Sequence, residues 1–342
     1  MSIAHRSQIM LGMIITFFTR LFSIIFAMLL VSSDFAFAKS SDRFDKNAIV
    51  KFERMKSGQY IIDVKVNAKG PFKFMIDTAA TRSSIFESTG KKLGLDIKND
   101  SNVIISGMTN SSYRPTVNVE TLQFSRYIFR DHKIVILKNW KDSETKIDGI
   151  LGLDVLNDLI LQFSHERKQL RFLKTLNSRK SKYRNWDAID LHTNPYPVQN
   201  YGLLFVYTQI GDVRIPTMLD TGANFTTLNW ESVKGTTIEK HKRRLREDWV
   251  IQGAIGKFSP KSHIKLDSLI IAGRKYKNYS LVVMDFDDLP INEYGKYPLV
   301  ITGVNLMSGQ DFILDLKSRK LLIKPQYELL DPHNLVIRIR KS

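Results

Sequence analysis

Cysteine is absent from this 342-residue sequence, and histidine is sparse. The absence of cysteine excludes disulfide bonds, thiol nucleophiles and thiolate metal ligands, and it is compatible with export without a disulfide framework. The seven histidines do not form an HExxH pattern or any other metal-ligand spacing. We therefore expect no metal site.

Acidic residues are few in relation to basic ones. Lys and Arg together number 51 and Asp and Glu 34, which gives a formal net charge of +17. Such a charge can serve binding to nucleic acid, to an anionic membrane surface or to acidic glycans, or it can simply keep the surface soluble. Since no nucleic-acid-binding motif accompanies it, we expect no nucleic-acid partner. The hydrophobic content of 43% is that of a globular protein with a substantial core.

The first 38 residues have the pattern of a targeting segment. Ile9–Phe18 is mostly apolar, and Ala36–Ala38 offers small residues at the two positions that a signal peptidase reads. We therefore interpret residues 1–38 as a signal peptide and expect an exported protein, periplasmic or secreted, with no stable membrane span after cleavage. The alternative is an uncleaved anchor over Ile9–Val31, in which Arg20 would place a costly charge near mid-bilayer.

Two stretches that lie 143 positions apart (220 − 77) carry the same pattern, in which an apolar run leads into an aspartate, a threonine, a minimal residue and an alanine. They are Asp77-Thr78-Ala79-Ala80 and Asp220-Thr221-Gly222-Ala223. A carboxylate that ends an apolar run costs free energy unless it is hydrogen-bonded or functional. A single copy is commonly a turn at the end of a strand. Two copies with matching flanks predict the two halves of one catalytic pair.

The chain around the two stretches alternates as β-strands do. The strands that we expect in the first half are 60–66, 71–76, 103–106, 117–124, 128–137, 161–163 and 169–173. A short strand and a helical turn are expected within 83–94, and a helical start at 153–156. The polar segment that follows is expected to be a linker, with a strand near its end around 188–191.

The second half of the chain repeats the first. A shift of 143 relates the two aspartate stretches and extends upstream to Ile62 and Phe205, while a shift of 151 (303 − 152) relates Gly152 to Gly303. The second copy therefore has 8 more residues in its middle (151 − 143). We place some of them in the basic run Glu239–Asp248.

These motifs resemble those of the aspartic proteases, specifically the retropepsin-like branch, over residues 50–325. The second stretch has the family's Asp-Thr-Gly-Ala motif in full, whereas Ala79 replaces the glycine in the first. A second mark is a pair of apolar residues before Gly152, matched less cleanly before Gly303, where Thr302 stands in an apolar position. A third mark is a glycine-rich flap, whose stronger copy has its tip at Gly253, Ala254, Ile255 and Gly256 and whose weaker copy has its tip at Gly107 and Met108.

The resemblance implies an all-β fold with two similar closed-barrel-like acid protease lobes in one chain and the active site between them, in a pepsin-like arrangement. It divides the chain into a signal peptide (1–38), an N-terminal aspartic protease lobe (39–175), a linker (176–200), a C-terminal aspartic protease lobe (201–325) and a basic tail (326–342). Because one chain carries both aspartate loops, the resemblance implies a monomer.

The resemblance also implies a function. Asp77 and Asp220 would be the catalytic residues of an exported endopeptidase, activating a water between them without a metal or an organic cofactor. Thr78 and Thr221 would interlock the two loops, and the expected partner is a peptide or protein substrate. The alternative is a non-catalytic peptide- or protein-binding module that keeps the acid protease fold, which Ala79 and the unequal flaps motivate.

One detail of the loops bears on pH dependence. Many pepsin-type enzymes have a Ser or Thr after the minimal residue, and its hydroxyl can donate to the catalytic carboxylate and hold the pKa of that group down. Here both positions are alanine, Ala80 and Ala223. We therefore expect the pair to lose its first proton at a higher pH than a pepsin-type site does.

Overall fold

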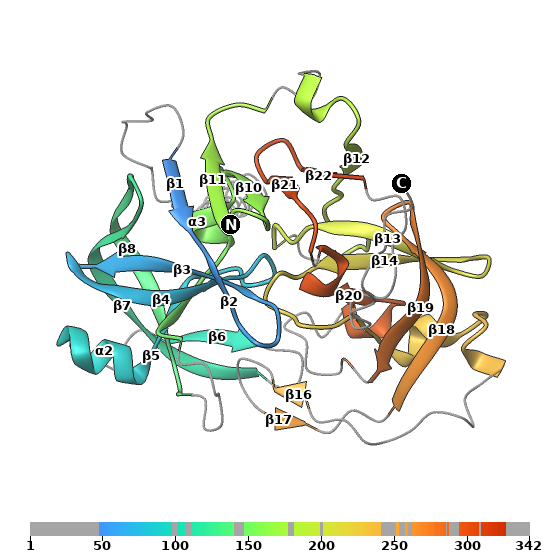
Figure 1. The fold of residues 1–342 in the computed structure, drawn as a ribbon. Coiled ribbons are helices and arrows are strands. Elements are labelled where there is room, and N and C mark those ends of the chain that lie inside the picture. Colours follow the sequence, from blue (N-terminus) through green and yellow to red (C-terminus); the bar gives the residue numbers. More distant parts are fainter. Residues whose placement is uncertain are drawn as a thin grey trace, which may run out of the picture. The chain divides into compact units, whose positions relative to one another are not determined.

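The computed structural model describes residues 48–97, 102–106, 111–139, 147–176, 181–198, 201–240, 251–252, 257–258, 262–284, 286, 294–307 and 309–325. The predicted signal peptide, the basic tail and both predicted flap tips lie outside these residues. Strands dominate the described chain (Figure 1), and the predicted all-β fold is confirmed. No helix among the described residues is long and apolar enough to cross a membrane.

A first barrel is formed within residues 53–156. Six strands follow one another in a ring, and the pairing of the last with the first closes it. In ring order they are β3 (Tyr60–Val66), β4 (Lys69–Ile76), β9 (Gly149–Leu151), β5 (Ser84–Phe86), β8 (Tyr127–Leu137) and β7 (Ser111–Phe124). Two further strands extend it, β2 (Glu53–Arg54) beside β3 and β6 (Asn102–Ser106) beside β7.

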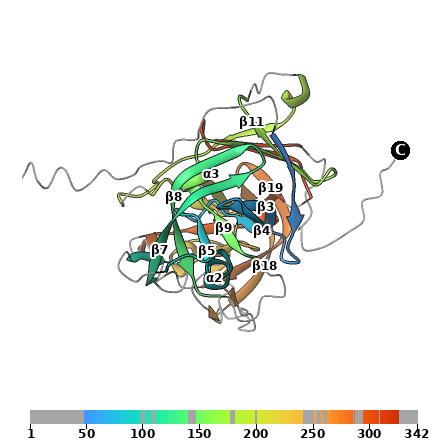
Figure 2. The same ribbon diagram turned by 90° about the vertical axis from the view of Figure 1, so that its left-hand side faces the viewer.

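Two short helices accompany the first barrel (Figure 2). Helix α2 (Glu87–Leu93) follows β5 directly and ends at Gly94, whose φ of 73° lies in the left-handed region that favours glycine. Helix α3 (Leu153–Leu156) follows β9. Both lie where the sequence predicted a helical turn.

A second barrel is formed within residues 203–307 and has the same ring order. Its strands are β13 (Phe205–Ile210), β14 (Val213–Leu219), β20 (Val300–Thr302), β15 (Thr227–Leu228), β19 (Arg274–Val283) and β18 (Ser262–Ile271). A separate two-stranded sheet pairs β16 (Ile251–Gln252) with β17 (Lys257–Phe258). The 3₁₀-helices here are η2 (Trp230–Val233), η4 (Tyr294–Lys296) and η5 (Val304–Met307).

A central sheet of six strands joins the chain segments that precede and follow the two barrels. Its order is β1 (Ala48–Lys51), β11 (Gln169–Leu173), β10 (Ile160–Ser164), β21 (Phe312–Asp315), β22 (Lys320–Ile323) and β12 (Asp187–Asp190). The order is symmetric about the β10–β21 pair, so each half of the chain supplies three strands. The segment predicted as a linker contains the strand that was expected around 188–191. This strand is β12, which pairs with β22 in the central sheet, and the 3₁₀-helix η1 (Ser181–Tyr183) precedes it.

The gapless repeat that the sequence suggested is wrong at its first strand. In the two barrels Met75 pairs with Ile61 and Met218 pairs with Phe205. Phe205 therefore corresponds to Ile61, a shift of 144 (205 − 61), and not to Ile62. The difference is one extra residue in β4, near an irregularity in its register with β3. A slip of one residue moves every side chain of a strand to the opposite face, and only the shift of 144 matches buried to buried positions.

The middle of the central sheet is a buried aromatic stack. Phe163 and Phe312 pair across β10 and β21, with ring centroids 4.4 Å apart and planes 15° apart. Tyr60 of the first barrel lies 4.6 Å from Phe163. All three side chains are fully buried. The stack therefore ties the first barrel to both halves of the central sheet.

Replacing Phe312 with alanine should lower the free energy of unfolding by about 3–5 kcal/mol, because it leaves a cavity where the two halves of the chain meet. Ile49→Ala, on the edge strand β1 at 43% exposure, should cost less than about 1 kcal/mol. Urea denaturation of both variants measures the difference. Equal costs would show that the aromatic stack does not hold the two halves together.

Candidate active site

Each aspartate loop begins where a strand of the barrel ends. β4 runs parallel to β9, and Asp77 follows its last residue with the backbone N–H of Asp77 donating to Leu151 O at 3.0 Å. β14 runs parallel to β20, and the N–H of Asp220 donates to Thr302 O, also at 3.0 Å. The two loops are thus placed by equivalent strand pairs at equivalent ends of the two barrels.

The predicted glycines that follow β9 and β20 pack directly against the backbone of these loops. A Cβ on Gly152 would lie 2.7 Å from Ala80 O, and one on Gly303 would lie 2.5 Å from Ala223 O. No side chain fits at such distances. Thr302, which stands where an apolar residue was expected, is fully buried, and its hydroxyl lies 3.2 Å from that of Thr226.

Four hydrogen bonds made by the hydroxyls of two buried threonines interlock the loops. The hydroxyl of Thr78 donates to Leu219 O at 2.7 Å and accepts from the N–H of Thr221 at 3.1 Å. The hydroxyl of Thr221 donates to Ile76 O at 2.8 Å and accepts from the N–H of Thr78 at 3.1 Å. Because both hydroxyls are buried and fully paired, this arrangement fixes the separation of the two loops.

The interlock brings the two aspartates together. Their carboxyl groups are partly buried and lie close enough for each to change the pKa of the other. Oδ1 of Asp77 also accepts from the N–H groups of Ala79 and Ala80, at 2.8 and 2.9 Å. Oδ1 of Asp220 accepts from those of Gly222 and Ala223, at 2.7 and 3.0 Å. Each carboxyl group therefore accepts from an equivalent pair of backbone N–H groups in its own loop.

Burial and mutual repulsion govern the charge of the pair. Burial raises the pKa of Asp77, and the backbone donors of its loop lower it in part. Burial and then the neighbouring Asp77 raise the pKa of Asp220 well above its usual value. Two carboxylates in contact cannot both ionise readily, so the pair holds one proton and titrates as a unit.

The glycine of the second loop has no room for a side chain. A Cβ on Gly222 would lie only 2.5 Å from Cγ of Asp77 and still closer to its Oδ2. Ala79, at the equivalent position of the first loop, does carry a methyl group, which packs against a hydrophobic cluster of the second barrel that includes Met218 and Ile301. The surroundings of the two carboxyl groups are therefore unequal, although their donors match.

A polar network behind each loop was not found from the sequence. In the first barrel, Asp154 accepts from the N–H of Ser83 at 2.9 Å and from its hydroxyl at 2.7 Å, and Nε2 of His132 lies 3.1 Å from the same carboxyl group. The hydroxyl of Ser83 in turn accepts from the N–H of Gly152. These bonds hold the end of the Asp77 loop on the helix that follows β9.

The second barrel has an uncharged equivalent of this network. Thr226, Asn305 and Tyr279 occupy the corresponding positions, with Asn305 Nδ2 donating to Tyr279 OH at 2.6 Å and the Thr226 and Tyr279 hydroxyls 2.8 Å apart. The repeat itself was a usable signal for these residues, since the shift of 151 relates Asp154 to Asn305.

A second residue that was missed is Gln59, immediately before β3. Its Nε2 donates to Gly222 O at 3.0 Å, so it reaches from the first barrel to the loop of the second. Neither a motif nor the strand pattern points to this contact, which spans 163 positions of the chain.

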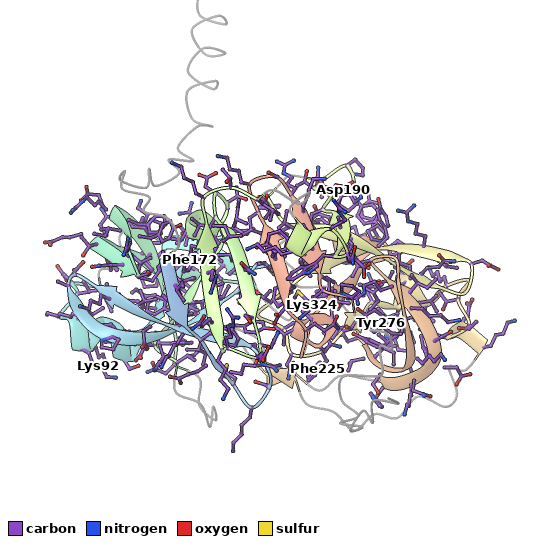
Figure 3. The ribbon with its side chains drawn as sticks, turned by 45° about the horizontal axis from the view of Figure 1, so that its top comes forward. Lys92, Phe172, Asp190, Phe225, Tyr276 and Lys324 are labelled. Atoms are coloured by element: carbon purple, nitrogen blue, oxygen red, sulfur yellow. The ribbon has the colours of Figure 1, made fainter. Side chains whose placement is uncertain are left out.

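Apolar side chains flank both loops. Ala80 packs with Met55, Val103 and Ile105 against a cluster of the first barrel. On the other side Ala223 and Phe225, the latter labelled in Figure 3, pack against the second barrel's cluster.

The predicted flap tips, at Gly107 and Met108 and at Gly253, Ala254, Ile255 and Gly256, lie outside the described residues. The strands that lead to them are paired as hairpins, β6 with β7 up to Ser106 and Ser111, and β16 with β17 up to Gln252 and Lys257.

Comparison with known proteins supports the resemblance seen in the sequence. Residues 62–155 match the family model described as aspartyl protease. The match runs from β3 to α3 and includes the Asp77 loop. It supports the similarity to retropepsin-like aspartyl proteases and a protease-type function. No curated protein matches the sequence.

The threonine interlock can be tested by stability alone. Thr78→Val and Thr221→Val should each lower the free energy of unfolding by about 2–4 kcal/mol, since each leaves a buried carbonyl and a buried N–H without a partner. Thr227→Val is the matched control, because its buried hydroxyl has no hydrogen-bond partner and its loss should be neutral or stabilising. Thermal and urea denaturation measure the free energy of unfolding of the three variants. An equal change in all three would contradict the interlock.

Proposed function

We propose that this chain, which is similar to the retropepsin-like aspartyl proteases, is an endopeptidase that hydrolyses peptide bonds with a water activated between Asp77 and Asp220. The observation that carries the proposal is the pair of adjacent, partly buried carboxyl groups at the junction of two equivalent loops, which the threonine interlock holds together. Each is held by two backbone N–H groups, so both are oriented before a substrate arrives.

The chemistry follows from the single shared proton. The ionised carboxylate takes a proton from the water while the oxygen of the water bonds to the carbonyl carbon of the scissile peptide bond. The protonated carboxyl group donates its proton to the carbonyl oxygen. When the C–N bond breaks, a carboxyl proton passes to the leaving amine. Because the two carboxyl groups titrate as a unit, the shared proton belongs to the pair, and a change at either aspartate alters the first ionisation of both.

The proposed substrate is an extended peptide with apolar side chains near the scissile bond. Such a peptide can pair its backbone with strand edges and direct alternate side chains into pockets. Apolar residues stand beside both loops, including Val103 and Ile105 on one side and Phe225 on the other. We further propose, from the sequence, that the protein is exported after cleavage of residues 1–38, and that one chain suffices for activity because it carries both loops.

A second candidate function is supported by Ala79. A methyl group at a position where the partner loop has no room for one favours a protein that still binds peptides between its barrels without cleaving them. Retention of both aspartates, both threonines and all eight interlocking and loop hydrogen bonds favours catalysis.

Asp77→Asn and Asp220→Asn should each reduce turnover of a quenched peptide library by about 10³-fold or more, because the pair acts as a unit. Asp315→Asn is a matched control, since Asp315 is a buried aspartate of β21 outside the site; it should keep turnover. Peptide binding by the Asp220→Asn variant is measured in parallel. Full turnover in Asp77→Asn or Asp220→Asn would refute a mechanism that needs both aspartates. If the wild type cleaves no peptide but the Asp220→Asn variant binds peptide, the protein is a non-catalytic binding module.

The pH–rate profile tests the role of Ala223. In the wild type, activity should be optimal in weakly acidic to near-neutral conditions, because burial raises the pKa of both carboxyl groups and neither loop supplies a hydroxyl donor. Ala223→Ser adds a donor that stabilises the ionised form, which lowers the pKa and moves the acidic limb to lower pH. Ala188→Ser, at an exposed position of β12, should leave the profile unchanged. Movement of the acidic limb to higher pH in Ala223→Ser would contradict this account.

A further inference from the structure

Gln59 forms a side-chain hydrogen bond from the first barrel to the aspartate loop of the second. It lies between β2 and β3, its side chain is buried, and its Nε2 donates to Gly222 O at 3.0 Å. The turn that carries it lies close to the second barrel, since a Cβ on the neighbouring Gly58 would lie 3.1 Å from Cγ2 of Val304. The bond is therefore made in a confined space between the barrels.

The amide of Gln59 is held in one orientation. Its Oε1 accepts from the hydroxyl of Ser57 at 2.5 Å. The carbonyl of Gly222 can only accept, so the nitrogen of the amide must face it. The backbone is fixed as well, because Gln59 O accepts from the N–H of Met55 at 3.0 Å. Gln59 is thus a preorganised donor.

The peptide unit that Gln59 contacts is the one that serves Asp220. Its carbonyl belongs to Gly222, and its N–H, that of Ala223, donates to Oδ1 of Asp220 at 3.0 Å. Donation to the carbonyl of a peptide unit polarises it and strengthens the hydrogen bond that its N–H makes. A chain of two hydrogen bonds therefore runs from Gln59 to the carboxyl group of Asp220.

Among the residues that the structure describes, the first loop has no equivalent of this donor. The register of the strands relates β3 to β13 by a shift of 144, which places Leu203 at the position of Gln59 (59 + 144). Leu203 is buried and apolar, so its side chain cannot donate. Gln59 therefore acts on only one of two otherwise matching sets of backbone donors.

We propose that Gln59 is a positioning residue of the reaction, which orients and polarises the Gly222–Ala223 peptide unit and so sets the hydrogen bonding of Asp220. This inference rests on the proposed function for its kinetic consequence, but not for its structural one. Loss of the Gln59 donor weakens the Ala223 hydrogen bond to the ionised carboxylate, which raises the pKa of Asp220 and moves the acidic limb of the pH–rate profile to higher pH.

Gln59→Met tests the proposal, because it keeps the length of the side chain and removes the donor. It should lower kcat/KM by about threefold to tenfold, the factor that the loss of one neutral hydrogen bond corresponds to. The loss should fall on kcat with KM nearly unchanged, and the acidic limb should move to higher pH. The matched control is Gln209→Met, since Nε2 of Gln209 donates to Gly211 O at the same distance of 3.0 Å in the exposed turn at the end of β13. This variant should change neither kcat/KM nor the position of the acidic limb.

Nuclear magnetic resonance separates this inference from the proposed function. In Gln59→Met the amide proton of Ala223 should shift upfield and exchange faster, and the carboxyl carbon of Asp220 should titrate at higher pH, whether or not the protein turns over peptide. If the wild type cleaves no peptide but these shifts appear, the proposed function fails and the role of Gln59 stands. If both signals and the pH profile equal those of the wild type, Gln59 is not a positioning residue.

Ser57→Ala provides a second test in case Gln59→Met does not fold. Ser57 is exposed, and its loss frees the Oε1 end of the Gln59 amide while leaving the donor in place. The same changes in Ala223 and Asp220 should appear with smaller size. Unchanged Ala223 and Asp220 signals in a folded Ser57→Ala variant would overturn the claim that Gln59 is preorganised.

Discussion

Two adjacent, partly buried carboxyl groups repel each other as soon as both ionise, and the arrangement of this chain follows from that constraint. The pair must be held together against the repulsion, and the negative charge that remains on it must be stabilised. The threonine interlock meets the first need with hydrogen bonds that cross between the loops. Two backbone N–H groups at each aspartate meet the second. The barrels and the central sheet supply the rigidity that both require.

The two-fold relation of the barrels is close in the strands and incomplete in the side chains. Strand order, the parallel pairs under each loop and the central sheet all repeat. The network behind the Asp77 loop contains a carboxylate and a histidine, whereas the network behind the Asp220 loop contains an amide and a phenol. Symmetric scaffolding thus gives two nearly equal aspartates, and these local departures from symmetry distinguish their environments.

The sequence was most informative at positions where both barrels need the same residue type. Both aspartate loops and the glycines beneath them could be predicted, because tight packing leaves only these residue types possible there. It was least informative where a contact depends on the path of a neighbouring strand. The extra residue in β4 changed the alignment of β3 without changing its alternating pattern. The strand expected around 188–191 is present as β12, but its polar surroundings did not indicate that it forms an edge of the central sheet. Gln59 makes its contact across the barrels from a turn, where no local rule applies.

Gly222 and Ala79 make the two halves of the chain unequal where the aspartate loops meet. If the halves arose by duplication of one ancestral unit, that unit faced itself across a symmetric junction, where each minimal residue lay against the other copy's aspartate. Gly222 still lies against Asp77 in this way, while Ala79 carries a methyl group packed on the other barrel. Two copies of the present first half would place a methyl group at both positions, including the one where Gly222 leaves no room beside Asp77. The two halves of this chain are therefore complementary at the junction and not interchangeable.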